Sequence, residues 1–499
     1  MTRVPRAVLV VLGGAVLALS ACAPEGETPE GGDQTRSVAG RIPDGCDWWK
    51  GSGYEGEPPT FSEGRWLRRE LKDFGLWELH QLLSRPPKGA SFTTDAFERV
   101  RAYAAAAIQK NRLQRDLNQA LSEDPALPPP AASVAEQRAK VATARAALEA
   151  QNSAVEAILR DQLAAALSES GFFTAHFLCT ALHLGSAELE SGLKNVLYRV
   201  TGKSAGSAKG VDYAGCVKVL GRVLPSSREA AFPPPLFSFG EPPVFLFVSP
   251  RTSLDSSAVA MFDTTLDLSD SRRVEKTLEG RCDVSAYMAQ VGGVAVLPTL
   301  VGYNNSGSVV PMLVTIAHEW THVYLGAMPL GRAYGKSYDL KSVNETVADL
   351  VGAELAELMA RRHYPVEWQA YDAPAPTDQA PEFNLGKARS DLRVQVEELL
   401  GQGLVKEAEE TMEAERRSWL AHTDRHGDRY WVRRVNQAYL GFYGAYASTD
   451  GASRIGARLR ELRRASSSLF AFLDRVSRID SIEPCAGCTS LFPPAPSGR

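Results

Sequence analysis

The sequence has no marked excess of charge of either sign, and this argues against one large class of partners. Its 55 lysine and arginine side chains nearly balance its 59 aspartate and glutamate side chains, which gives a net charge of −4. Domains that bind nucleic acids usually carry a basic surplus that neutralises phosphates. We therefore expect no nucleic-acid partner.

Long apolar runs are also scarce. No segment beyond the N-terminal stretch reaches the ~18 consecutive apolar residues that a membrane-spanning helix needs. The overall apolar content of 44% is ordinary for a soluble globular protein. Because 499 residues exceed what one hydrophobic core usually organises, we expect two or three domains.

The N-terminus has the pattern of a secretory signal, not of a folded element. Two arginines are followed by an apolar stretch at 7–18, which is too short to span a bilayer comfortably. The letters LSAC at 19–22 then resemble a bacterial lipobox. The resemblance implies that 1–21 is a signal peptide, that the thiol of Cys22 receives a lipid, and that the protein is anchored in the bacterial cell envelope, facing the periplasm or the outside. The alternative is an ordinary signal peptide whose removal leaves Cys22 as a free thiol.

Residues 22–44 are rich in Pro, Gly, Glu and Thr and contain few apolar side chains. Such a segment cannot bury enough surface to fold. We expect a flexible linker that tethers the folded part to the lipid anchor.

Seven cysteines are present, and six remain once Cys22 is assigned to the lipid. An even number in an exported chain suggests disulfides, with fifteen possible connectivities. The pair Cys485 and Cys488 is most simply a structural bridge, although a redox pair or half of a metal site is the alternative. A bridge between Cys179 and Cys216 is a further hypothesis. The remaining two are Cys46 and Cys282.

Residues 45–235 have the pattern of a helical N-terminal domain. Two alanine-rich runs at 93–121 and 133–170 are separated by a proline-rich break. They predict a long antiparallel helical hairpin over about 93–170. The alanine stripe is most simply a packing seam between the helices. A coiled coil that docks a partner is the alternative.

The rest of the chain combines a few strands with many helices, so we expect a mainly α fold with a small β-sheet (α+β). Strands are predicted at 243–249, 284–290 and 293–300, and helices at 274–279, 310–325 and 342–362. The expected divisions are a catalytic core at 236–364, a loop at 365–381, a helical domain at 382–480 and a Cys/Pro-rich tail at 481–499.

The predicted helix at 310–325 carries the motif His318-Glu319-Trp320-Thr321-His322. Residues four apart share one face of a helix, so both imidazoles can reach one metal ion. Zinc favours imidazole and carboxylate ligands in catalytic sites, where it lowers the pKa of a bound water toward ~7. Glu319 lies close enough to accept a proton from that water. The alternative is a buried helix with two hydrogen-bonded core histidines.

The next predicted helix carries Asn344-Glu345-Thr346-Val347-Ala348-Asp349. With the HExxH motif, this sequence resembles the gluzincin metallopeptidases, the clan of thermolysin and the zinc aminopeptidases. The resemblance covers about a quarter of the chain, 243–359. It implies a zincin-like core in which Glu345 is the third zinc ligand and Asp349 orients the ring of His318. The alternative for Glu345 is a favourable acid in the first turn of a helix.

Peptidases of this clan also pair an edge strand with the substrate and supply a hydrogen-bond donor to the transition state. Residues 293–300 are the candidate edge strand, with a buried hairpin as the alternative. The candidate donors are Tyr439 and Tyr430, followed by His422 and His426. Each could equally be an ordinary packing residue. Arg433 and Arg434 could instead bind a substrate carboxylate.

The sequence thus predicts an exported, lipid-anchored metallopeptidase with one zinc ion and a peptide or protein substrate. An aminopeptidase is the first alternative, weakened because no GxMEN-type motif precedes the HExxH helix. A non-catalytic zinc lipoprotein that docks a partner is the second, and the intact Glu319 argues against it. The isolated histidines His80, His176, His183 and His363 are expected to be surface or core residues.

Overall fold

The computed structural model describes residues 89–122, 133–183, 217–218, 231–255, 257–262, 266–295, 299–303, 308–334, 336–373, 383–422, 432–443 and 454–482. These residues are mostly helical with small sheets, so the predicted α+β class is confirmed. The signal peptide, Cys22, the linker and nearly all of the tail lie outside the described residues. Within the described part, no helix is both long and apolar enough to cross a bilayer.

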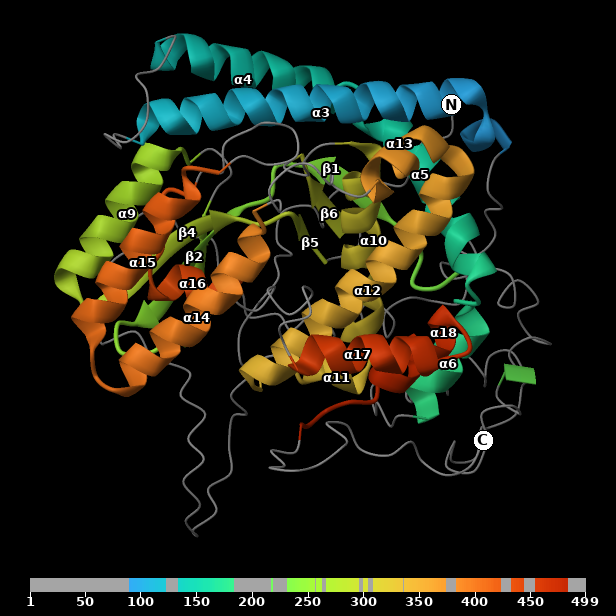
Figure 1. Ribbon diagram of the computed structural model, residues 1–499. Coiled ribbons are helices and arrows are strands. Elements are labelled where there is room, and N and C mark those ends of the chain that lie inside the picture. Colours follow the sequence, from blue (N-terminus) through green and yellow to red (C-terminus); the bar gives the residue numbers. More distant parts are fainter. Residues whose placement is uncertain are drawn as a thin grey trace.

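The alanine-rich runs form three helices, not two. Helix α3 (Thr94–Leu121) and helix α4 (Val134–Glu149) lie side by side at one end of the molecule (Figure 1). Helix α5 (Asn152–Glu169) then begins anew and packs against the interior of the protein. The single helix predicted for 133–170 is therefore wrong.

The break in that helix has a polar cause at Asn152. Its side-chain amide donates to the Phe239 carbonyl (3.0 Å) and to the Tyr303 hydroxyl (2.7 Å), and its oxygen accepts from the Tyr103 hydroxyl (2.8 Å). These three partners come from different parts of the chain. Asn152 therefore fixes the point at which α5 departs from α4.

One three-stranded sheet has the order β3-β2-β4, with all pairs antiparallel: β2 (Val244–Pro250), β3 (Ser257–Phe262) and β4 (Val284–Gln290). Alternate residues of a strand face opposite sides of the sheet. Val244, Leu246 and Val248 accordingly enter a small core with helix α9 (Leu268–Arg281). Phe245 and Phe247 belong to the main core instead.

The second sheet has the order β1-β6-β5. Two of its strands, β5 and β6, occupy the range for which one strand was predicted, 293–300. Strand β5 (Gly293–Val294) pairs antiparallel with β6 (Thr299–Gly302), and β6 pairs parallel with β1 (Phe237–Gly240). The predicted run contains a proline at 298, a residue type that cannot donate to a strand ladder. The two short strands form the hairpin that was the alternative, and β5 still lies at the edge of this sheet within the described residues.

Helices α10 (Val309–Gly326) and α12 (Tyr338–His363) pack closely against each other, and the short α11 (Pro329–Arg332) connects them. Almost all of α10 is buried. The backbones come close together at Gly352, where a Cβ atom would lie 2.9 Å from the backbone nitrogen of His318. Glycine is therefore the residue that lets these two helices meet.

The C-terminal region is helical, largely as predicted. Its helices are α14 (Leu385–Gly401), α15 (Val405–Trp419), α16 (Gln437–Tyr443), α17 (Arg454–Ala465) and α18 (Leu469–Val476). The loop predicted at 365–381 is wrong in its first half, because α13 (Pro365–Asp372) occupies it. Proline is well tolerated at the first position of a helix. The short helix predicted at 274–279 is part of the longer α9.

Two of the six remaining cysteines lie in the described part of the chain, and both form disulfides. They are Cys179, in helix α6 (Thr174–His183), and Cys282, which follows α9. The expectation that cysteines outside the lipid site are oxidised is met at these two positions. The hypothetical bridge from Cys179 to Cys216 stays a prediction, because Cys216 lies outside the described residues.

Candidate metal centre

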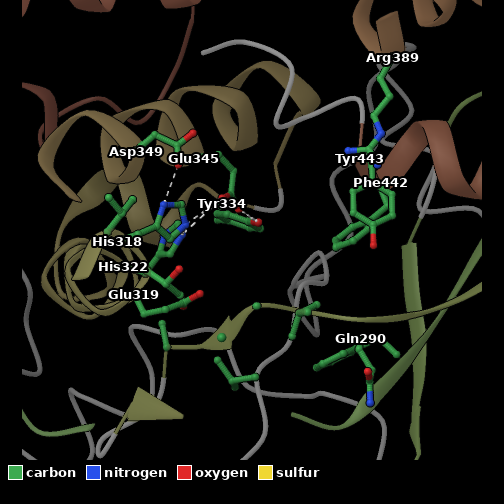
Figure 2. A pocket seen from close by; sticks show the side chains of 18 residues that line it. Gln290, His318, Glu319, His322, Tyr334, Glu345, Asp349, Arg389, Phe442 and Tyr443 are labelled. Atoms are coloured by element: carbon green, nitrogen blue, oxygen red, sulfur yellow. Dashed lines mark hydrogen bonds and ion pairs between the residues drawn. The ribbon is translucent and has the colours of Figure 1, made fainter. Parts of the chain in front are cut away.

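Helices α10 and α12 bring three side chains together at one point (Figure 2). The Nε2 atoms of His318 and His322, one turn apart on α10, are 2.9 Å from each other. The Oε2 atom of Glu345, on α12, lies 3.6 Å from Nε2 of His318 and 3.4 Å from Nε2 of His322. This group could hold a metal ion.

The opposite nitrogen of each ring is held by a residue of α12. Nδ1 of His318 donates to Oδ1 of Asp349 (2.8 Å), as the sequence predicts. Nδ1 of His322 donates to Oδ1 of Asn344 (2.8 Å), whose own amide nitrogen points to the Leu330 carbonyl (3.5 Å). With Nδ1 protonated, a neutral imidazole presents a lone pair at Nε2. Both rings are thus set with acceptor atoms toward Glu345.

Glu345 supplies the strongest indication that the group accommodates a cation. Its Oε2 atom is buried and has no hydrogen-bond donor within the described part of the protein. A buried carboxylate oxygen without a donor is costly unless a positive charge faces it. Burial raises the pKa of Glu345, but when the two imidazole rings carry positive charge they outweigh that effect and hold it well below its usual range, so the carboxylate stays ionised. The three converging acceptors therefore favour positive charge at their centre.

Glu319 lies beside this group and is also buried, with 9% of its surface exposed. Burial raises the pKa of its carboxyl group, and the charges of Glu345 and Asp349 act in the same direction, against the two histidines. Strand β5 covers it closely: a Cβ atom at Gly293 would lie 2.5 Å from Oε1 of Glu319. Glycine at 293 therefore leaves the space that this carboxylate occupies.

Tyr334 is a residue of the centre that the motif search missed. It follows α11 in the connection between the two motif helices, and its hydroxyl donates to Oε1 of Glu345. Its ring lies 6.4 Å from the ring of His322. The sequence offers one indication of its role, which is its position: Tyr334 is the single tyrosine in the segment 327–337 between the two ligand helices.

A cleft of about 380 Å³ opens at the centre. One wall carries the histidines, Glu319, Tyr334, Glu345 and Asp349. The other wall is built from the β3-β2-β4 sheet and the C-terminal helices and contains Gln290, Arg389, Phe442 and Tyr443 (Figure 2). This volume is in the range typical of small-molecule and short-peptide sites, ~300–1,000 Å³.

Of the four predicted transition-state donors, the structure describes Tyr439 and His422, and neither lines the cleft at the metal group. Tyr439 is buried, its hydroxyl accepts a hydrogen bond from Nε of Arg389 (2.5 Å), and it is not among the described residues that line the cleft. His422 stacks on Phe383 with ring centroids 4.2 Å apart. Tyr430 and His426 lie outside the described residues.

Arg433 and Arg434 are committed to internal ion pairs, which corrects their candidate role in substrate binding. Arg433 donates to both carboxylate oxygens of Glu275, and Arg434 donates to Glu279 (2.9 Å). Glu275 is almost fully buried. These pairs fasten the segment before α16 to α9 and β4, so the arginines stabilise the fold.

The isolated histidines that are described behave as packing residues. His363 is buried between the rings of Phe92 and Phe97, with centroids 5.4 and 5.2 Å away. His176 packs edge-on against Phe470. His80 and the side chain of His183 lie outside what the structure describes.

Comparison of the chain with protein-family models, with curated proteins and with solved structures finds no match, so the geometry of the centre is the available guide to its chemistry.

Proposed function

We propose that the protein is a zinc-dependent peptidase of gluzincin type with a zincin-like core, exported and anchored in the bacterial cell envelope through a lipid on Cys22. The observation that carries the proposal is the buried Oε2 of Glu345, which faces two imidazole nitrogens without a hydrogen-bond donor. Two imidazoles and one carboxylate form a common ligand set of catalytic zinc.

The spacing of the three ligand atoms supports zinc. Ligand atoms ~2.0–2.2 Å from a tetrahedral zinc lie roughly 3.3–3.6 Å from one another. The two distances to Glu345, 3.4 and 3.6 Å, fall in this range. The 2.9 Å between the Nε2 atoms is about 0.4 Å short of it, a change that small ring rotations can supply.

In the proposed reaction His318, His322 and Glu345 hold the metal, while Asp349 and Asn344 fix both rings in the required tautomer. When bound, zinc would polarise the scissile carbonyl and lower the pKa of a water toward ~7. Glu319 accepts a proton from the attacking water as the water oxygen bonds to the carbonyl carbon. It then delivers the proton to the nitrogen of the leaving amine as the C–N bond breaks.

Tyr334 is the best-placed donor for the negative charge that develops on the carbonyl oxygen. Tyr334 lines the cleft, and its hydroxyl donates its one proton to Oε1 of the ligand carboxylate Glu345, so it serves the carbonyl oxygen by exchanging this partner during the reaction. Donors of this kind typically supply ~2.7–4 kcal/mol. We therefore assign to Tyr334 the role that the sequence suggested for Tyr439.

The substrate backbone is proposed to lie along β5. This strand lines the cleft next to Glu319, and its partner β6 is on one side only within the described residues. An extended peptide can add to such an edge through main-chain hydrogen bonds.

The alternatives have less support. A structural zinc site has no need for a buried carboxylate such as Glu319 at the cleft. An aminopeptidase would need an acid to hold the free amine of its substrate. Among the described lining residues, the wall opposite the metal group carries a cation, Arg389, and no carboxylate.

The test is Glu319→Gln in the mature protein, with zinc measured by mass spectrometry and hydrolysis measured with a peptide library. We expect zinc to be retained and turnover to fall by roughly 10²–10⁴-fold, because the proton acceptor is lost. Glu357→Gln, at a half-buried position of α12 that pairs with Arg361, is the matched control and should keep full activity. Undiminished hydrolysis by Glu319→Gln would contradict the proposed mechanism.

A further inference from the structure

The wall of the cleft that faces the metal group carries a single described cation, Arg389. This arginine lies on α14, a helix that follows the two motif helices α10 and α12 in the sequence. Figure 2 shows its side chain reaching down toward Tyr443 and Phe442, across the cleft from His318 and Glu345. The guanidinium is therefore presented to whatever occupies the space between.

Two tyrosines hold Arg389 in place. Its Nε donates to the Tyr439 hydroxyl at 2.5 Å. Its guanidinium carbon lies 4.7 Å from the centre of the Tyr443 ring and 5.3 Å from that of Tyr439. Tyr439 is buried and packs in turn on Tyr287, with ring centroids 5.1 Å apart. Cation–π contacts and one hydrogen bond thus fix the guanidinium without using all of its donors.

Among the described residues, none neutralises the charge of Arg389. Burial raises the pKa of Tyr439 and Tyr443 above the usual phenol range, so both rings stay uncharged at neutral pH. Of its five N–H donors, only Nε has a hydrogen-bond acceptor within the described part of the chain, and no described carboxylate pairs with it. The acids of the cleft, Glu319, Glu345 and Asp349, belong to the opposite wall.

Three other described arginines behave differently. Arg251 pairs with Glu409, Arg433 with Glu275, and Arg463 with Glu354, each through two hydrogen bonds. A half-buried arginine that has no such acid among the described residues, lies against two aromatic rings and lines a cleft has the features of an anion-recognition residue.

We propose that Arg389 binds a carboxylate group of the substrate and thereby determines which peptides are cleaved. The inference rests on the proposed peptidase function. Its ligand is a carboxylate near the scissile bond, supplied either by the free C-terminus of a peptide or by an aspartate or glutamate side chain. The planar guanidinium suits a two-pronged hydrogen bond with such a group.

The first experiment measures binding and does not depend on turnover. The zinc-loaded Glu319→Gln protein is titrated calorimetrically with randomised hexapeptide pools that carry either a free C-terminal acid or a C-terminal amide. A second pair of amidated pools contains Asp and Glu or, in their place, Asn and Gln. We expect at least about tenfold tighter binding of the carboxylate member of one pair, from charge-assisted hydrogen bonds. Equal binding within both pairs overturns the inference.

The pair of peptide pools whose two members bind with different affinity identifies the source of the carboxylate. A difference between acid and amide pools assigns the C-terminus, which would make the enzyme release short C-terminal fragments. A difference only between the Asp/Glu and Asn/Gln pools assigns an acidic side chain.

The second experiment changes the arginine. In Arg389→Gln with native Glu319, kcat/KM for the preferred carboxylate pool should fall to the level of its neutral partner, mainly through KM. Arg389→Lys, which keeps the charge but loses the planar fork, should retain part of the preference and guards against misfolding of the first variant. Lys387→Gln on the same helix removes an exposed charge paired with Asp391, and should change nothing.

The outcomes separate this inference from the proposed function. A wild-type enzyme that cleaves carboxylate and neutral pools equally well is a peptidase, but its specificity does not come from Arg389. A zinc-loaded wild type that cleaves no pool contradicts the peptidase function, while the calorimetric comparison still decides whether Arg389 binds carboxylates.

Discussion

At the scale of single residues, the centre depends on side chains whose neighbours restrict them to one arrangement. Asp349 and Asn344 hold the two imidazoles by Nδ1, and Tyr334 holds Glu345 by Oε1. Removing a residue that hydrogen-bonds to a metal ligand typically lowers metal affinity or activity by ~10–100-fold. The restriction on Glu319 is steric instead, since it comes from the absence of a side chain at Gly293.

Gly293→Ala should reduce hydrolysis while zinc stays bound. The new Cβ atom would lie 2.5–2.7 Å from three atoms of the Glu319 side chain, so the carboxylate must turn away. Displacement of a catalytic group by ~1 Å can cost about 10²-fold in rate. Steady-state kinetics with parallel zinc analysis would test this.

Gly89→Ala is the control for that substitution, because a Cβ atom at 89 meets nothing within 4 Å. It should behave as the wild type. Full activity in Gly293→Ala would mean that Glu319 tolerates another position, and the proton-transfer role assigned to it would need revision.

The residues that sequence analysis could identify are those tied to the motif by helical periodicity. His318 and His322 share a face because they are four apart, and the relation of Asp349 to Glu345 follows the same rule. Tyr334 and Arg389 could not be identified in this way. Their positions at the cleft depend on how the chain turns between α10 and α12 and on how α14 docks, and neither property has a local period.

At the scale of elements, the centre is a contact between two helices, α10 with His318 and His322, and α12 with Glu345. Both helices were predicted, and α10 lies within one residue of the predicted 310–325 at each end. Helix α12 begins four residues before the predicted start at 342, where the side chain of Ser337 caps it. The prediction failed where a tertiary contact overrides local preference. Asn152 ends an otherwise continuous alanine-rich run because its amide has partners on β1 and at Tyr303.

Gly352→Ala should weaken zinc binding and lower stability together. A methyl group at this position would lie 2.9–3.1 Å from backbone atoms of α10 at His318 and Val314, which cannot rotate away as a side chain can. The helices must separate, which carries Glu345 away from the histidines. Overpacking of this kind costs ~1–3 kcal/mol, more than the ~1 kcal/mol that alanine gains over glycine in a helix.

Thermal unfolding with and without a zinc chelator measures both effects of that change. Gly280→Ala on α9 is the matched control, since it replaces a helical glycine with open space around it and should be neutral or stabilising. If Gly352→Ala binds zinc as tightly as the wild type, the contact between α10 and α12 does not set the ligand geometry.

At the scale of the whole molecule, the main core extends through nearly every described element, from α3 to α18, and only the face of the β3-β2-β4 sheet toward α9 forms a separate cluster. The cleft therefore lies within a continuous hydrophobic framework, and its two walls come from different parts of the sequence. The fold class was predictable from composition and periodicity. The domain divisions expected from the sequence stay predictions.

The location of the molecule depends on residues outside this framework. The apolar stretch at 7–18 followed by LSAC predicts that Cys22 becomes the lipidated N-terminus. Disulfides at Cys179 and Cys282 agree with an oxidising compartment. Cys22→Ser, expressed in a bacterium, should therefore abolish labelling with a radioactive fatty acid. The variant should either keep its signal peptide or appear in the soluble fraction.

A second variant separates export from anchoring. Replacing 1–21 with a signal peptide that is cleaved without lipid attachment, together with Cys22→Ser, should give a soluble exported protein that keeps zinc and peptidase activity, because the centre lies far along the chain. Fatty-acid labelling that persists in Cys22→Ser would contradict the anchor at this cysteine. Loss of zinc in the soluble form would mean that the N-terminal segment contributes to the fold.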